Sequence, residues 1–411
     1  MIHQSQFITQ CRSCGSPLGG IFCDLGTMAV ANSYIPPECA QDFEPIYPLK
    51  ARVCSQCRLV QLDTNVDAHT IFSDYAYFSS ASATWLGHAR RLALEMTGRL
   101  DLGPKSFVVE VASNDGYLLR NFVQAKIPCL GVEPAANIAQ VAQAAGIPTE
   151  VAFFGRETAE RLVAAHGAAD LVVANNVMAH VPDINDFAAG LALMIGRKGM
   201  ISVEVPHLLR LVDGVQFDTI YHEHYLYWSL YAFEALLARH GLAVVDVERL
   251  PTHGGSLRIM ARKGPSRPSA AVMAVRAEEK KRGLADEAFY TGFDERVRAV
   301  TAGLRSWIEQ AVASGRKVCA YGAAAKGNTL LNAAGISAAL ILAVADRSPA
   351  KQGRLLPGSH VPVVTPEAML AMHPDDILIL PWNIASEIVR DMRAAGFAGR
   401  MLIAVPELKE A

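Results

Sequence analysis

Two series of short apolar segments, each followed by a turn and a helical pattern, constrain the fold of this chain most. The first series comprises residues 107–111, 130–133, 171–174, 200–205 and 242–250. The second comprises residues 317–322, 340–345, 376–381 and 401–405, after a charged, helical connector around residues 275–300. Strands that alternate with helices in this way form doubly wound parallel sheets. The sequence therefore predicts two α/β domains.

The composition indicates what such a chain can bind. Its 411 residues are 51% hydrophobic, which is enough to fill several separate cores. Its 40 acidic and 38 basic side chains nearly balance, so we expect no basic surface that attracts nucleic acids or anionic membranes. We expect a small-molecule substrate, no nucleic-acid or membrane partner, and a monomer or small homo-oligomer.

We expect no targeting segment. Residues 1–7 lack the charged start and the apolar run of roughly 7 to 15 residues that secretory signals have. The most apolar later stretches, at residues 171–174 and 377–380, are far shorter than the roughly 20 residues of a membrane-spanning helix. The protein is therefore expected to be soluble and cytoplasmic.

Residues 1–70 differ from the rest of the chain and predict a zinc-binding module. They hold six of the eight cysteines, four of which form the pairs Cys11-x-x-Cys14 and Cys54-x-x-Cys57. Four thiolates fill the tetrahedral shell of a zinc ion and leave no position open for catalysis, so this zinc would be structural. Reduced free thiols or a redox pair are the alternative, although neither pair lies in a thioredoxin-like setting.

The turn after the strand at residues 107–111 is a candidate cofactor site, because ligands bind at this carboxyl edge of α/β sheets. Gly116 is its single glycine, which is a poor fit to the Gly-rich loop of dinucleotide sites. Its pattern E-x-A-x-N-D-G is instead similar to the first motif of class I methyltransferases, which use S-adenosylmethionine. The resemblance implies Glu110 near the amino acid end of the cofactor, with the backbone around Asn114 and Gly116 close to it.

Two later segments extend this cofactor site. Glu133 ends the next strand, where a carboxylate can accept both ribose hydroxyls of an adenosine. Residues 170–181 have the form of the fourth-strand motif whose loop borders the methyl donor, and the candidate contacts there are Asn175, Asn176 and His180. Taken singly, Glu133 is equally typical of a helix cap, and the second segment of an ordinary strand end. Their order and spacing together predict a class I, Rossmann-like methyltransferase domain at residues 71–275.

Residues 217–229 have the composition of an active site, with two histidines, two carboxylates and three tyrosines. Methyl transfer to carbon needs a base beside a carbonyl and a donor for the enolate oxygen, and His and Tyr suit these tasks. His222 and His224 would share one face of an extended strand and could be metal ligands, but no third ligand accompanies them. Either histidine is also compatible with a packing role, and Glu223 with orienting a histidine or pairing with a lysine.

Residues 276–411 predict a second Rossmann-like domain whose first turn is a candidate phosphate site. Residues 318–328 run from a strand through small residues into a helix, whose amides could hold a phosphate while Lys326 adds charge. Close packing of alanine and glycine is the alternative. A dinucleotide is disfavoured because only Gly322 and Gly327 are glycines there.

Motifs along the whole chain resemble one family, the sugar C-methyltransferases that act on thymidine-diphosphate-linked 4-keto-6-deoxy sugars in the biosynthesis of branched deoxysugars. These motifs follow one order, which makes the resemblance specific. The matching segments are residues 11–14, 54–57, 74–80, 110–116, 221–224, 253–258, 321–328 and 351–353.

The resemblance implies a structural zinc on Cys11, Cys14, Cys54 and Cys57, and a nucleotide sugar between the middle and C-terminal domains. It implies that His224 removes the proton on C3, beside the C4 ketone, and that the methyl group enters at C3. Tyr221, Glu223 and Tyr75 would line the same site as catalytic residues. The candidate substrate contacts are Tyr77, His222, His253, Lys326, Asn328 and Lys351.

Two other functions are compatible with the sequence. Transfer to nitrogen or oxygen of a nucleotide sugar or another small molecule would need no strong carbon base. A zinc-ribbon module that binds RNA or protein, with the methyltransferase fold as a scaffold or modifying unit, is the alternative from another class. The lack of basic stretches speaks against it.

Overall fold

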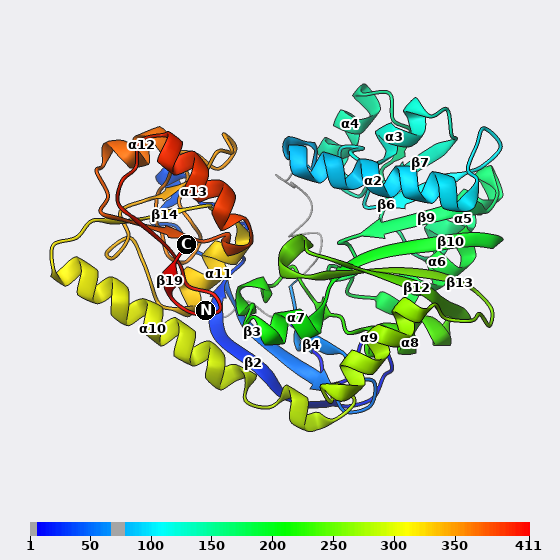
Figure 1. The fold of residues 1–411 in the computed structure, drawn as a ribbon, viewed down its shortest axis with the longest axis horizontal. Coiled ribbons are helices and arrows are strands. Elements are labelled where there is room, and N and C mark those ends of the chain that lie inside the picture. The colour runs from blue at the N-terminus through cyan, green and yellow to red at the C-terminus, as the bar shows by residue number, and fades with distance from the viewer. Residues whose placement is uncertain (1–5, 67–78) are drawn as a thin grey trace.

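The computed structural model describes residues 6–66 and 79–411. They form a four-stranded N-terminal sheet, a seven-stranded sheet, a six-stranded sheet and a two-stranded pair of β1 (Gln6–Phe7) with β5 (Thr64–Asn65). Figure 1 shows the two larger sheets in separate lobes, with the N-terminal strands β2 (Leu18–Ala29) and β3 (Ile46–Cys54) below and between them. Within these described ranges, none of the helices combines the length and the apolar character needed to cross a membrane.

The seven-stranded sheet is the core of the expected methyltransferase domain. Its strands are β6 (Val108–Val111), β7 (Cys129–Val132), β8 (Thr149–Glu150), β9 (Ala169–Asn175), β10 (Ile195–Pro206), β12 (Leu242–Leu250) and β13 (Ser256–Lys263). Their order is β12-β13-β10-β9-β6-β7-β8. The pairs from β10 to β8 are parallel, whereas β13 is antiparallel to both of its neighbours. The sheet is therefore parallel through its centre and mixed at one edge.

Helices cover both faces of this sheet, as the doubly wound pattern predicts. Val108 shares a core with α2 (Ala83–Leu100), α3 (Leu119–Gln124) and α4 (Ala136–Ala144). Val109 shares another core with α5 (Arg156–His166), α6 (Ile184–Met194) and α8 (Leu230–Arg239). Successive strand residues point to opposite faces, and burial of both faces explains why the strands are continuous apolar runs.

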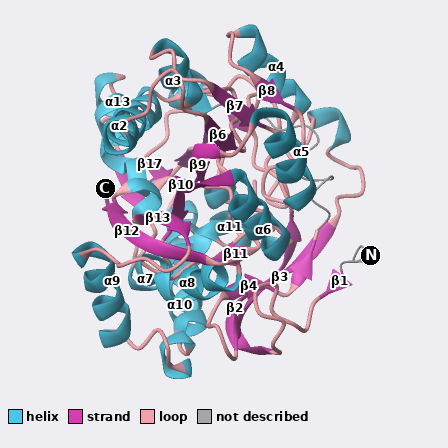
Figure 2. Cartoon of the chain, turned by 90° about the vertical axis from the view of Figure 1, so that its right-hand side faces the viewer, coloured by secondary structure: helices cyan, strands magenta, loops and turns pink. Residues whose placement is uncertain are grey.

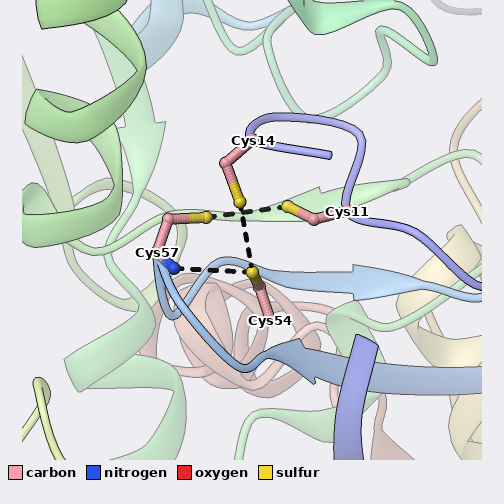
Figure 3. Close-up of side chains that lie close together, drawn as sticks. All are labelled: Cys11, Cys14, Cys54 and Cys57. Carbon is pink, nitrogen blue, oxygen red and sulfur yellow. Dashed lines mark hydrogen bonds between the residues drawn. The ribbon is translucent and has the colours of Figure 1, made fainter. Parts of the chain in front are cut away.

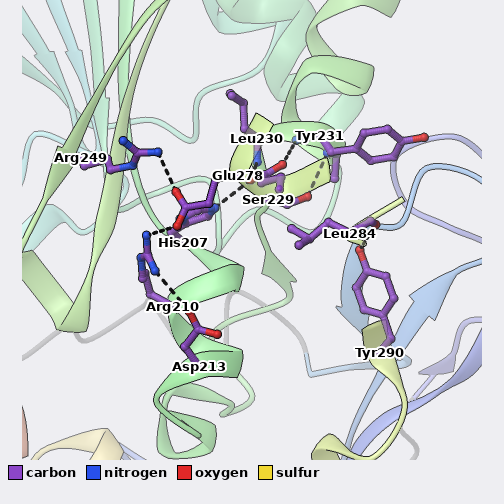
Figure 4. Close-up of polar contacts among 12 residues, drawn as sticks. His207, Arg210, Asp213, Ser229, Leu230, Tyr231, Arg249, Glu278, Leu284 and Tyr290 are labelled. Atoms are coloured by element: carbon purple, nitrogen blue, oxygen red, sulfur yellow. Dashed lines mark hydrogen bonds and ion pairs between the residues drawn. The ribbon is translucent and has the colours of Figure 1, made fainter. Parts of the chain in front are cut away.

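The start of the predicted connector is the helix α9 (Ala270–Lys281), which is fastened to the methyltransferase domain by ion pairs (Figure 4). Arg210, on α7 (Leu208–Asp213), and Arg249 both donate to the carboxylate of Glu278. The neighbouring Glu279 accepts from the first two backbone N–H groups of α8. A carboxylate at a helix N-terminus satisfies free amide donors and interacts favourably with the helix dipole.

The six-stranded sheet forms the second α/β domain. Its strands are β14 (Val318–Tyr321), β15 (Val344–Ala345), β16 (Val363–Val364), β17 (Asp376–Ile379), β18 (Arg400–Ile403) and β19 (Lys409–Glu410), in the order β16-β15-β14-β17-β18-β19. Only the pair of β18 with β19 is antiparallel among its described pairs. The face with Ala320 packs against α10 (Phe293–Ala313) and α11 (Ala325–Ala333). The face with Cys319 packs against α12 (Pro366–Ala371) and α13 (Ala385–Ala394), so this domain is Rossmann-like as predicted.

The N-terminal sheet joins the cysteine-rich module to the methyltransferase domain. Its strands β2, β3 and β4 (Val60–Leu62) are completed by β11 (Leu226–Tyr227), which comes from the predicted active-site segment. β11 pairs antiparallel with β4, and Figure 2 shows the two strands next to each other. The active-site segment is therefore anchored in the sheet that carries Cys54.

Candidate active site

The four expected cysteines converge on one point (Figure 3). The Sγ atoms of Cys11, Cys14, Cys54 and Cys57 all lie within 4.8 Å of one another, with Cys11 and Cys57 at 3.6 Å and Cys14 and Cys54 at 3.4 Å. Four sulfurs placed about 2.3 Å from one zinc ion in a tetrahedron are about 3.8 Å apart, so the cluster fits zinc. All four ligands come from the protein, which makes the site structural.

Hydrogen-bond donors surround these thiolates. The backbone N–H groups of Gln56 and Cys57 donate to Cys54 Sγ at 3.4 Å, and the side-chain amide of Gln61 donates to Cys11 Sγ at 3.2 Å. Contacts of this kind orient metal ligands and favour their charged form. Gln61 lies on β4 opposite Leu226 of β11, so the zinc site is one strand away from the active-site segment.

The turn after β6 has an uncommon backbone shape. Ala112, Asn114 and Gly116 adopt left-handed conformations, with φ values of 54°, 50° and 77°. An added Cβ at Gly116 would lie 2.3 Å from Cδ1 of Ile147, so this position requires glycine. Non-glycine residues in the left-handed region are uncommon and concentrate at functional sites, which supports a ligand-binding role for the turn.

Glu133 links the two loops that the sequence assigns to the cofactor. Its carboxylate accepts from the backbone N–H groups of Asn114 and Ala135, both at 2.9 Å. Burial raises the pKa of Glu133, whereas these two amides lower it. Each carboxylate oxygen can accept more than one hydrogen bond, so a ribose hydroxyl can still be bound here.

Several buried polar atoms beside these loops have no hydrogen-bond partner among the described residues, which is typical of a site that binds a polar molecule. They are Asp115 Oδ1, Asn175 Oδ1 and both side-chain amide atoms of Asn176. Burial raises the pKa of the Glu110 carboxyl well above its usual value, against the lowering effect of Tyr117. S-adenosylmethionine is cationic and rich in hydroxyl and amine groups, so it would satisfy these buried groups. The residues present therefore fit this cofactor.

Tyr221 and His224 form a hydrogen-bonded pair in the active-site segment. The Tyr221 hydroxyl lies 2.7 Å from His224 Nε2, and the ring centroids are 4.0 Å apart. His224 Nδ1 lies 2.9 Å from the carbonyl oxygen of Thr219. Because a carbonyl oxygen only accepts, Nδ1 carries the proton and Nε2 accepts from the Tyr221 hydroxyl. The pair therefore couples a basic nitrogen to a phenol.

His180 lies against this pair, with its ring centroid 4.7 Å from that of His224. Its Nδ1 donates to the backbone carbonyl of Glu223 at 2.8 Å. Burial lowers the pKa of His180 to about 4. Burial also lowers the pKa of His224 well below its usual value, and the charges of His180 and Lys326 lower it further. Both rings are therefore neutral near pH 7, the form in which histidine acts as a base.

Glu223 contacts the N-terminal module. Its two carboxylate oxygens accept from the side-chain amide of Asn32, at 2.9 and 2.8 Å. Burial raises the pKa of Glu223 to about 7, while Asn32 lowers it. Asn32 follows β2, so the module that carries the zinc ligands also holds a predicted active-site carboxylate.

The expectation that His222 and His224 share one face of a strand is wrong. Residues 221–223 form a bend and a turn, closed by the backbone bond from His224 N–H to the Tyr221 carbonyl. His222 therefore packs against β3, where its ring centroid lies 5.9 Å from that of Tyr47 and its Nε2 lies 3.2 Å from the Tyr47 carbonyl oxygen. The described contacts of the two histidines thus lie on different sides of the segment.

His253 lies in the turn between β12 and β13, at φ 54°, with its ring centroid 5.4 Å from that of Trp85. Burial lowers the pKa of His253 to about 4, and the positive charge of Lys326 contributes to the lowering. Lys326 therefore acts electrostatically on His253 as well as on His224.

The turn between β14 and α11 contacts the N-terminal module. The carbonyl oxygen of Ala323 accepts from the Tyr34 hydroxyl at 2.6 Å and from the Lys351 ammonium at 2.8 Å. The side-chain amide of Asn328 donates to the carbonyl oxygen of Ala31 at 3.3 Å. The predicted substrate residues Lys351 and Asn328 thus lie beside the segment that follows β2.

Lys326 extends from α11 toward the methyltransferase domain. Its Nζ is buried and lies 4.9 Å from the ring centroid of Trp382. Trp382 Nε1 donates to Asp218 Oδ2 at 2.7 Å, and Asp218 belongs to the active-site segment. The C-terminal domain therefore adds a cation beside the segment that carries Tyr221 and His224.

The candidate residues thus form two groups. Glu110, Asn114, Gly116, Glu133, Asn175 and Asn176 lie at the ends of β6, β7 and β9, whereas Tyr221, Glu223 and His224 cluster with His180. Tyr75 and Tyr77 lie outside the described residues. Asn32, Tyr34 and Trp382 are not predicted, because no motif marks them. Asp218 stands in the predicted segment without an assigned role.

Comparison with known proteins identifies all three modules. Family models match residues 11–72 as a zinc binding domain, residues 86–247 as a methyltransferase domain and residues 251–406 as a C-methyltransferase C-terminal domain. Two solved structures are similar to part of the chain. Magnesium protoporphyrin IX methyltransferase of Synechocystis PCC 6803, with bound SAH, is 14% identical, with a TM-score of 0.36, over 48% of this chain and 92% of that chain. The PH0226 protein of Pyrococcus horikoshii OT3 is 12% identical, with a TM-score of 0.36, over 47% of this chain and 97% of that chain.

A curated relative matches the whole chain. The C-methyltransferase NovU of Streptomyces niveus is 36% identical over 405 residues, which make up 97% of this chain and 96% of NovU. Such identity over nearly all of both chains shows that this protein belongs to the C-methyltransferase family that includes NovU, as an enzyme that uses S-adenosylmethionine and carries a structural zinc ion.

Proposed function

We propose that this enzyme methylates C3 of a nucleotide-linked 4-keto-deoxy sugar, with thymidine diphosphate as the nucleotide, in the cytoplasm. The observation that carries the proposal is the half-buried, hydrogen-bonded pair of Tyr221 and His224, in which desolvation lowers the pKa of the His224 imidazole well below its usual value. A carbon beside a ketone must lose a proton before it can attack a methyl group, and a neutral imidazole is suited to remove it.

A nucleotide sugar suits the surroundings of this pair. The N-terminus of α11 carries a partial positive charge that favours phosphate, and Lys326 and Lys351 flank it. We propose that His253, Lys326, Asn328 and Lys351 contact the substrate, together with Tyr77 and His222 from the sequence prediction. The proposed domains are residues 1–70, 71–275 and 276–411, with the sugar between the second and the third.

The proposed reaction begins with proton removal by His224. The C3–H bond breaks, its electron pair forms the C3=C4 bond, the C4 oxygen becomes an enolate, and the proton ends on Nε2. Tyr221 donates to Nε2 in the resting arrangement and must yield this position or relay the proton. S-adenosylmethionine supplies the electrophilic methyl group that C3 attacks. Glu223 and Tyr75 are proposed to line the same site.

The cofactor contacts are proposed at Glu110, Asn114, Gly116, Glu133, Asn175 and Asn176. The unpaired buried atoms of Asn175 and Asn176 and the left-handed turn at Asn114 and Gly116 support this role. His180, which the sequence assigns to the cofactor, packs on His224, so we propose that it lies between the methyl donor and the base.

The test follows methyl transfer and hydrogen exchange at C3 together. The purified enzyme is incubated in heavy water with labelled S-adenosylmethionine and a thymidine-diphosphate 4-keto-6-deoxyhexose, and products are analysed by mass spectrometry. His224→Ala is expected to lose about 100-fold or more in both exchange and methylation, since general bases contribute rates of this order. The matched control is His166→Ala, an exposed histidine on α5.

Other outcomes separate the alternatives. A labelled methyl group on nitrogen or oxygen, formed without C3 exchange, would contradict carbon methylation. Full activity of His224→Ala would show that His224 is not the base. Exchange and methylation of a different keto sugar would support the proposed reaction but contradict the proposed substrate.

A further inference from the structure

Lys326 has an uncommon environment for a lysine. It is the second residue of α11, its side chain is half-buried, and its ammonium is fully buried. Within residues 6–66 and 79–411 the ammonium has no hydrogen-bond partner. A lysine ammonium carries three donors, and burial of a charge without hydrogen bonds is costly. Such a group is typical of a site that is completed by a ligand.

The groups around the ammonium do not satisfy its donors. The Trp382 ring, 4.9 Å away, offers a cation–π contact, which attracts the charge but accepts no conventional hydrogen bond. The Asp218 carboxylate raises the pKa of Lys326, against the larger lowering by burial. Asp218 Oδ2 already accepts from Trp382, and Asp218 Oδ1 has no partner among the described residues. Lys326 is thus held near Asp218 without a hydrogen bond to it.

The ammonium faces the catalytic region. Trp382 approaches the turn that carries His253, because a Cβ added at Gly254 would lie 2.4 Å from Trp382 Cη2. The charge of Lys326 also lowers the pKa of His224 and of His253. The ammonium therefore lies on Trp382, which contacts Asp218 of the active-site segment and approaches the turn of His253.

We propose that the Lys326 ammonium binds the C4 oxygen of the sugar, as a ketone in the substrate and as an enolate after proton loss. This inference rests on the function proposed above. C4, which carries this oxygen, is bonded to C3. A group that donates a hydrogen bond to the C4 oxygen must therefore lie close to His224, the base proposed to remove the C3 proton. The phosphate on C1 lies across the sugar ring, where the backbone amides of α11 and Lys351 are available.

The charge balance favours this role. When the C3–H bond breaks, the proton goes to His224 and a full negative charge develops on the C4 oxygen. A preorganised cation in a buried site stabilises such a charge much more than water does.

The experiment measures C3 exchange and nucleotide affinity in the same variants. Lys326→Met keeps the length of the side chain and removes its charge, and Lys326→Arg keeps the charge. Lys317→Met is the control, because Lys317 is exposed just before β14 and donates to the Met372 carbonyl. Exchange is followed in heavy water at saturating keto sugar without the methyl donor, and affinity is measured by calorimetry with thymidine diphosphate alone. The affinity for S-adenosylmethionine verifies folding, and Lys326→Gln replaces Lys326→Met if the latter does not fold.

We expect Lys326→Met to slow exchange and methylation about 100-fold to 1000-fold, the cost of losing one oxyanion donor, with the affinity for thymidine diphosphate within about twofold of wild type. Lys326→Arg should recover part of the exchange rate. Normal exchange at saturation with an affinity for thymidine diphosphate reduced about tenfold or more would assign Lys326 to the phosphates and overturn the proposal. Absence of exchange in the wild-type enzyme itself would refute the proposed function, and this inference with it.

Discussion

The side-chain amide of Asn32 donates hydrogen bonds to both carboxylate oxygens of Glu223, at 2.9 and 2.8 Å. Asn32 follows a strand of the N-terminal sheet, and Glu223 lies between Tyr221 and His224 in the sequence. The same sheet contains β11, the strand that directly follows the active-site turn. The zinc-binding module therefore contacts the proposed active site directly.

The pair of Asn32 and Glu223 predicts a pH-dependent loss of stability in Asn32→Ala. Burial raises the pKa of Glu223 to about 7, above its unfolded value, so the stability it contributes is present at low pH and is lost as the pH rises through the folded pKa. The hydrogen bonds from Asn32 lower the pKa of Glu223. Without them this pKa rises further, and the ionised carboxylate has fewer hydrogen-bond donors. We expect a loss of about 1 kcal/mol near pH 5.5 and about 2 kcal/mol near pH 8.5, measured as Tm shifts from wild type at each pH.

Two variants control this experiment. Asn121→Ala removes a side-chain amide that donates to the Leu118 carbonyl, which does not titrate, so its Tm shift should be the same at both pH values. In a Glu223→Gln background the effect of Asn32→Ala should also become independent of pH. Equal Tm shifts of Asn32→Ala at both pH values in the wild-type background would contradict the assignment.

The zinc site predicts that loss of the metal lowers kcat without weakening cofactor binding. We expect one zinc ion per chain by elemental analysis. Cys54→Ser should lose the metal and reduce kcat to below about a tenth, because the fold of a zinc module depends on its metal and this module holds β11 and Glu223. Its affinity for S-adenosylmethionine should change little, since Glu133 and Asn175 lie in the other sheet.

Cys39→Ser is the matched control for the zinc variant, because Cys39 lies outside the cluster. It should retain both metal and activity. A metal-free Cys54→Ser enzyme with normal kcat would show that the active site does not depend on the N-terminal module.

The environment of His224 predicts how kcat changes on the acid side of the pH–rate profile. His224 must be neutral to accept a proton, and burial with the charges of His180, Lys326 and His253 lowers its pKa well below the usual value. The other titratable groups on the elements around it include the hydroxyls of Tyr221 and Tyr227 and the carboxyls of Asp218 and Glu223. In a Glu223→Gln background, which removes the carboxyl whose pKa is raised to about 7, we expect kcat to stay constant as the pH falls past about 6.5 and to decrease only at lower pH. A midpoint at or above this value would contradict the prediction, provided that bound zinc and Tm are unchanged over the same range.

Much of the fold could be predicted because its strands are buried on both faces. Continuous apolar runs such as residues 107–111 and 171–174 give a clear signal between helices. Short strands give none, so β8 and β11, of two residues each, are not predicted. β13 is not predicted either, although its first residues, Ser256 to Arg258, belong to a segment that matches the family.

The active site could be predicted only where its residues are neighbours in the sequence. Tyr221 and His224 are three positions apart, whereas Asn32 and Glu223 are 191 apart, and Asp218 and Trp382 are 164 apart. The long-range contacts depend on how three modules pack, which no local pattern encodes. For His222 only the expected strand face is wrong, since the turn directs its ring to Tyr47 rather than to the side of His224.

The loops after β6 and β7 predict that Glu133→Ala weakens binding of the cofactor and leaves proton removal unchanged. Glu133 accepts from the backbone of Asn114 and of Ala135, so its carboxylate fixes both loops and remains able to bind ribose hydroxyls. Glu133→Ala should raise the Kd for S-adenosylmethionine about tenfold to a hundredfold, since a hydrogen bond to a charged group contributes about 1.5 to 3 kcal/mol. Calorimetry measures this affinity, with the exposed Glu157→Ala as the control. Exchange at C3 without the methyl donor should be unchanged in Glu133→Ala, because His224 lies in another segment and is held by Thr219 and Tyr221. An equal loss of exchange and cofactor affinity would mean that the two loops shape the whole active site.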